Sequence, residues 1–253
     1  MKKLLALLAF VSIMVSCSKD DVSIDNNVID KTANLQPTGS SSHDLLSDDT
    51  YTSMVIELVY VEGYQPTSTA INNFVSFLNA RTFKPGGITV ESRSVPSPGI
   101  ASFTTQDYVD FEADNRTKFN TDNQIAVWAF FADGKADGDT STQVTLGTAY
   151  RNTSFIIYEK TIQSLSGSIH QPSTPVLETT AIEHEFGHIL GLVGFGAAMQ
   201  TPHEDPNYPK HCDVESCLMY YAASTGSNIL NTGGTVPQLD AQCIADLQAN
   251  GGK

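Results

Sequence analysis

The sequence IEHEFGHILG, residues 182–191, decides how the rest of the chain is interpreted. It contains two histidines four positions apart, His184 and His188, and Glu185 follows the first of them directly. Residues four apart lie on the same face of an α-helix, one turn above the other, so both imidazoles can reach one ion. Glu185 is then placed to act on a water molecule at the metal instead of on the metal itself.

The residues around this motif favour the helix that it needs. Thr174-Pro175 is a good helix start, with a hydroxyl cap and a proline at the first helical position. Gly191 is a residue at which such a helix can end and turn. The two histidines lie roughly opposite the apolar face, so we expect the histidines in a cleft and the apolar face on a sheet. That apolar face consists of Ile182, Phe186, Ile189, Leu190 and Val193.

Coincidence and a pair of core histidines are the alternatives to a metal site. With six histidines in 253 residues, chance produces this motif in roughly under 1% of such chains, and the pattern places both histidines away from the apolar face. We therefore interpret them as zinc ligands. Catalytic zinc usually takes three protein ligands and leaves the fourth position to water, so a third ligand must be found.

The motif resembles that of the metzincin metalloproteases, in which His-Glu-x-x-His-x-x-Gly is followed by a third ligand and later by a turn that contains a methionine, the Met-turn. His184, Glu185, His188 and Gly191 match this pattern. The usual third ligand would fall three residues after the glycine, where this chain has Gly194. The usual pattern therefore fails at that position.

The segment HCDVESCLM, residues 211–219, resembles the continuation of the motif in the archaemetzincin branch. The simplest account is an insertion over residues 194–210, ahead of the third ligand. The resemblance then implies His211 as that ligand and Met219 as the methionine of the Met-turn. The insertion itself contains His203, which stays open as an alternative third ligand.

Tyr221 lies two residues after Met219 and matches a tyrosine that steadies the oxyanion in some metzincins. A packed aromatic residue in the turn is the alternative. Residues 182–221 as a whole are similar to putative metalloproteases among bacterial surface lipoproteins. The likeness is specific over these forty residues and only architectural before them.

Three cysteines, Cys212, Cys217 and Cys243, lie in the second half of the chain. The archaemetzincin branch uses four cysteines for a second, structural zinc, and Asp246 occupies the fourth position here. In an exported protein we expect one disulfide among the three cysteines, with its pairing open. A site with three cysteines and one aspartate is the alternative.

The N-terminus indicates export. Residues 1–16 have a short basic start and an apolar stretch, which is typical of a secretory signal and too short for a permanent membrane span. The signal ends in a sequence that resembles a bacterial lipobox, with Cys17 as the lipidated residue. An ordinary signal peptide is the alternative. We expect an outer membrane lipoprotein, surface-exposed or periplasmic, that contacts the membrane only through its lipid.

We expect residues 17–50 to be a flexible tether, because they are rich in Ser, Asp, Asn and Thr. Residues 51–253 are enough for one domain with a real core, and we expect a monomer. The net charge of −14 argues against nucleic acid and anionic membrane surfaces as partners.

The element order before the motif predicts a parallel sheet covered by helices. We expect strands over residues 54–61, 88–92 and 124–131, with helices after Pro66 and over residues 105–119. Two short strands follow over 146–150 and 154–158, and one of them should form the sheet edge at the cleft, where a peptide could add as a further strand. A last helix is expected over residues 239–246. The expected fold class is α+β: a metzincin-like catalytic domain with a mixed, mostly parallel twisted sheet, packed helices, an active-site helix, a Met-turn and a C-terminal helix.

The acidic loop DGKADGD, residues 133–139, is either a solvated turn or a calcium loop, and its spacing does not match the EF-hand pattern. For the whole protein we expect a zinc-dependent endopeptidase acting on a peptide or protein substrate, with Glu185 as general base. Two alternatives stay open: a surface binding protein with this fold and little turnover, and a zinc hydrolase of non-peptide amides or esters.

Overall fold

A five-stranded sheet organises the computed structural model, which describes residues 30–167, 171–225 and 234–253. The strand order is β2-β1-β4-β7-β6, and every neighbouring pair is parallel except β6 with β7. The predicted parallel sheet is therefore confirmed, with β6 as an antiparallel edge. The strands are β1 (Ser53–Val61), β2 (Ile88–Val95), β4 (Gln124–Phe131), β6 (Gly147–Arg151) and β7 (Ser154–Ile157).

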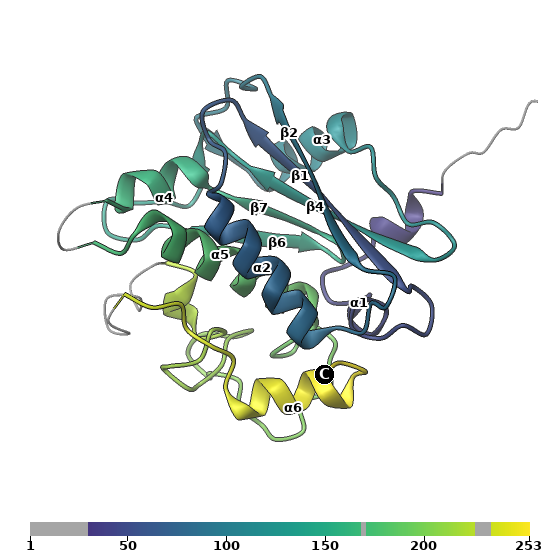
Figure 1. Ribbon diagram of the computed structural model, residues 1–253. Helices are drawn as coiled ribbons and strands as arrows, with labels where there is room; N and C mark the ends of the chain where they lie inside the picture. The colour runs from purple at the N-terminus through teal and green to yellow at the C-terminus, as the bar shows by residue number, and fades with distance from the viewer. Residues whose placement is uncertain (1–29, 168–170, 226–233) are drawn as a thin grey trace, which may run out of the picture.

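Helices cover both faces of this sheet. Helices α2 (Ser68–Arg81) and α5 (Thr174–Ile189) pack on one face, and α3 (Thr105–Asn115) packs on the other (Figure 1). The segment after α5, yellow-green to yellow in Figure 1, forms a lower layer beyond α5. The remaining elements are η1 (Thr32–Asn34), α1 (Ser42–Leu46), β3 (Ser102–Phe103), β5 (Lys135–Ala136), α4 (Glu159–Leu165), η2 (Tyr221–Ala223) and α6 (Ala241–Ala249).

The central strand β4 contributes side chains to two hydrophobic cores, one on each face of the sheet. Its side chains alternate between the faces, so Ile125 and Val127 join the core under α2 and α5, while Trp128 and Phe130 join the core under α3. Phe74 of α2 meets Phe186 of α5 edge-on, with ring centroids 5.1 Å apart. Helix α5 is thereby fixed on the sheet, and its position fixes that of its histidines.

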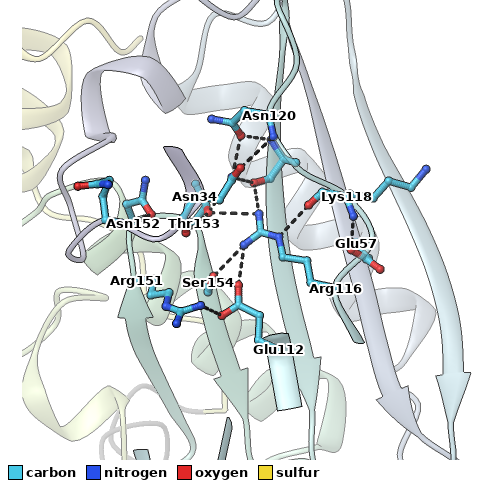
Figure 2. Close-up of polar contacts among 12 residues, drawn as sticks. Asn34, Glu57, Glu112, Arg116, Lys118, Asn120, Arg151, Asn152, Thr153 and Ser154 are labelled. Carbon is cyan, nitrogen blue, oxygen red and sulfur yellow. Dashed lines mark hydrogen bonds and ion pairs between the residues drawn. The ribbon is translucent and has the colours of Figure 1, made fainter. Parts of the chain in front are cut away.

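The predicted tether is wrong for residues 30–50, the part of it that the structure describes. Leu45 and Leu46 are fully buried in the core under α2, and Asn34 is also fully buried. The Asn34 side-chain amide donates to the carbonyl of Ala126 and to the side chains of Asn120 and Thr153 (Figure 2). A polar segment can be ordered in this way, because bonds to buried partners satisfy its side chains.

A buried ion pair lies beside Asn34. The side chains of Arg116 and Glu112 are each 1% exposed, and Nη1 of Arg116 lies 2.7 Å from Oε1 of Glu112. Arg116 also donates to the carbonyl of Ala126 and to the hydroxyl of Ser154, and Arg151 pairs with the second oxygen of Glu112 (Figure 2). Because Arg116 has extended backbone, helix α3 ends at Asn115 and not at the predicted residue 119.

The N-terminal predictions lie outside the described residues: the signal over residues 1–16 and the lipidation of Cys17. In the described part of the chain, no helix combines the length and the apolar character needed to cross a membrane.

Candidate metal centre

Helix α5 carries His184 and His188, and a later loop brings His211 to them. One ligand atom from each of the three histidines lies within 4.8 Å of the others. His203, the alternative third ligand, lies in a different cluster. The structure therefore joins His211, and not His203, to the pair on the helix.

Backbone carbonyls orient two of these rings. The Nδ1 atom of His184 lies 2.8 Å from the carbonyl of Leu218, and the Nδ1 atom of His211 lies 3.0 Å from the carbonyl of Pro209. A carbonyl only accepts, so each Nδ1 carries the proton and each Nε2 keeps a lone pair. The Nε2 atoms of His184 and His188 lie 3.1 Å apart.

Burial keeps the cluster uncharged. It lowers the pKa of His184 to about 3 and the pKa of His188 well below its usual value, and the neighbouring histidines add to both effects. Burial also lowers the pKa of His211. Neutral imidazoles with converging lone pairs are the donor set that zinc takes, so the residues fit that ion.

Glu185 lies against the edge strand β6. Its Oε2 atom accepts a 2.8 Å hydrogen bond from the backbone N–H of Ala149. Burial raises the pKa of Glu185 to about 8, against the opposing effect of that bond; a cation nearby would lower it. Gly147 makes this approach possible, since a Cβ there would lie 2.6 Å from Cγ of Glu185.

Two glycines let the chain fold back under α5. Gly191 has a φ of +83° and ends the helix as predicted. Gly187 faces Met219, whose sulfur would lie 2.3 Å from a Cβ at position 187. Met219 thus packs against the helix between the two turns that carry His184 and His188, and its neighbour Leu218 bonds to His184.

A second group with metal-binding geometry consists of His203, Cys212, Asp240 and Cys243, with Cys217 next to it. The expected disulfide is absent. Cys212, Cys217 and Cys243 are buried free thiols, and the sulfurs of Cys217 and Cys243 lie 3.6 Å apart, against about 2.05 Å in a disulfide. The Nδ1 atom of His203 lies 3.4 Å from the sulfur of Cys212 and 4.0 Å from that of Cys243. Its Nε2 atom bonds to Asp246 at 2.8 Å.

Distances in this cluster fit a metal better than a disulfide. Tetrahedral sulfur ligands about 2.3 Å from zinc lie about 3.8 Å from one another, close to the 3.6 Å between the sulfurs of Cys217 and Cys243. Hydrogen bonds from the thiols of Cys217 and Cys243 lower the pKa of Cys212. Asp246, which the sequence offered as a possible metal ligand, instead accepts a hydrogen bond from Nε2 of His203.

Tyr221 stacks on Tyr208, a residue of the insertion that the sequence did not single out. The ring centroids lie 3.4 Å apart with planes 7° from parallel, and both rings line a cavity that reaches His211. In contrast, Asp133, Asp137 and Asp139 belong to neither of the two groups with metal-binding geometry among the described residues. The calcium prediction is therefore unsupported.

No protein-family model matches the chain, and no curated protein matches it. Among solved structures, archaemetzincin from Methanopyrus kandleri aligns over 79% of this chain and 96% of its own, with a TM-score of 0.53 and 17% identity. A zinc-dependent peptidase from Methanocorpusculum labreanum covers 76% of this chain and 99% of its own (TM-score 0.45, 13% identity). Metalloproteinase-II from Bacteroides fragilis covers 87% of this chain and 57% of its own (TM-score 0.42, 15% identity). This chain thus shares the fold of a solved archaemetzincin.

Proposed function

We propose that this chain is a metzincin-like zinc endopeptidase in which His184, His188 and His211 hold the ion. The observation that carries the proposal is the convergence of three neutral imidazoles beside a buried carboxylate. When bound, zinc would supply a Lewis acid that makes water acidic enough to attack a carbonyl near neutral pH.

Side chains and backbone groups of the protein carry out the remaining steps. Glu185 takes a proton from the attacking water and delivers it to the leaving amine. The N–H of Ala149 holds one carboxylate oxygen of Glu185, which leaves the other for proton transfer. Tyr221 donates to the developing oxyanion, and Met219 supports the histidines as the Met-turn residue. Among the described strands, β6 pairs only with β7, so an extended substrate can add on its other side as a further strand.

We propose in addition that Cys212, Cys217, Cys243 and His203 hold a structural zinc. The hydrogen bond that Nε2 of His203 donates to Asp246 supports this assignment, since a carboxylate that accepts from the outer nitrogen is the usual way to orient a histidine ligand. At the N-terminus, a lipid on Cys17 would anchor the protein to the outer membrane, exposed at the surface or facing the periplasm.

The test compares wild-type and Glu185→Ala protein, both loaded with zinc, against a broad peptide library. Loss of the general base should lower kcat/KM by about 10²–10⁴-fold while zinc content stays equal. Equal cleavage by the two proteins contradicts the mechanism. Peptide binding without cleavage favours a binding protein, and faster turnover of esters or non-peptide amides favours the other hydrolase.

A further inference from the structure

A cavity of 710 Å³ opens directly beside His211. Its lining comes from several elements: Leu165 ends α4, Leu177 lies in the first turn of α5, and Val144 precedes the edge strand β6. Such a volume lies within the range of about 300–1,000 Å³ found for ligand pockets. The cavity therefore offers a place for a substrate group next to the reacting centre.

Among the described residues, the lining carries no Asp, Glu, Lys or Arg side chain, although the chain has 28 acidic and 14 basic residues. Apart from the proposed zinc ligand His211, the lining residues are Ser, Thr, Gln, Val, Leu, Pro and Tyr. An ionised group entering this cavity would lose water without gaining a charged partner, which is unfavourable. For an uncharged group, the free-energy cost of losing water is much smaller.

One wall of the cavity is the stacked pair of Tyr208 and Tyr221. Tyr208 comes from the insertion over residues 194–210 and is 43% exposed. Its hydroxyl bonds to that of Tyr221, which raises the pKa of Tyr208. The pair presents rigid aromatic surface, which suits contact with another large apolar or aromatic group.

We propose that this cavity binds a large uncharged side chain of the peptide substrate, and that Tyr208 is a specificity-determining residue for that side chain. The inference rests on the proposed peptidase function. It adds a role for the insertion, which both delivers His211 to the metal centre and builds one wall of the pocket.

The experiment uses zinc-loaded protein and peptidyl hydroxamates that differ only in the side chain next to the hydroxamate. Wild type should bind the phenylalanine compound at least about 10-fold more tightly than the alanine compound, with the glutamate compound weakest. Tyr208→Ala should reduce the preference for phenylalanine over alanine, and Tyr208→Phe should keep it, because stacking survives. Phe83→Ala is the matched control, since Phe83 is also an aromatic residue with 43% exposure and is not part of the cavity lining.

The outcomes distinguish a failure of the pocket proposal from a failure of the proposed peptidase function. Equal binding of the three compounds, absence of binding, or an unchanged preference in Tyr208→Ala overturns the pocket. Parallel assays with cleavable peptides test the function: cleavage without any side-chain preference overturns the pocket alone. Side-chain preference in binding without any cleavage supports the pocket and contradicts the peptidase function.

Discussion

The backbone N–H of Ala149 donates a 2.8 Å hydrogen bond to Oε2 of Glu185, which ties the edge strand β6 to the motif on helix α5. The strand proposed to bind the substrate therefore also bonds to the proposed general base. The cavity proposed for a substrate side chain lies beside His211, and its lining includes Thr145, two residues before β6. The strand edge, the carboxylate and the cavity would together fix the scissile bond.

Gly147→Ala should disturb this arrangement. The new Cβ would lie 2.6 Å from Cγ of Glu185 and 3.0 Å from Cδ1 of Ile157, so the carboxylate or the strand must shift. A misplacement of about 1 Å can cost about 10²-fold in rate, and we expect a loss of that order in kcat/KM at unchanged zinc content. Gly138→Ala, where a Cβ meets nothing within 4 Å, should keep full activity. If both variants are equally active, β6 does not position Glu185.

Metal analysis should separate the two clusters. We expect two zinc ions per chain in the wild type and one in each of His211→Ala and His203→Ala, because each variant loses a ligand of a different cluster. Cleavage should disappear only in His211→Ala, while His203→Ala should lower the Tm. Elemental mass spectrometry measures the stoichiometry. Two retained zinc ions in His203→Ala would exclude that residue as a ligand.

Arg116→Ala should strongly destabilise the fold, because it leaves Glu112 buried and without its closest charged partner. Breaking a buried pair in this way costs about 3–5 kcal/mol, and urea denaturation measures it. Lys118→Ala is the control. Lys118 pairs with Glu91, and their side chains are 38% and 53% exposed, so losing this pair should lower the free energy of unfolding by less than about 1 kcal/mol. Similar losses in both variants would show that burial of the pair is irrelevant.

Stability should fall as the pH rises from about 5 to 9. Burial, with the nearby charge of Glu178, raises the pKa of Glu159 to about 9 from an ordinary value of 4.5. Between these values the folded chain binds more protons than the unfolded chain, so the free energy of unfolding decreases with pH. Glu159→Gln should flatten this slope in Tm measurements at pH 5, 7 and 9. The exposed Glu62→Gln should not; an unchanged slope in Glu159→Gln would assign the effect to other groups.

The ends of helix α5 depend on local interactions and follow from the sequence. The proline and glycine signals predicted the ends of α5 to within two residues, since caps and helical periodicity act over a few residues. For residues 30–50, the polar composition predicts a flexible tether, which the structure contradicts. Asn34 is ordered by partners at positions 120, 126 and 153, and composition carries no information about such distant bonds.

The sequence by itself determined the relation of His184, Glu185 and His188, because a helix with 3.6 residues per turn places them without help from the rest of the chain. It also identified His203 and His211 as the candidates for the third ligand. Only the tertiary structure places His211, and not His203, beside the pair on the helix. Both lie in or next to an irregular insertion, where no backbone period directs a side chain. His203 bonds to the distant Asp246, while His211 lies beside His184 and His188.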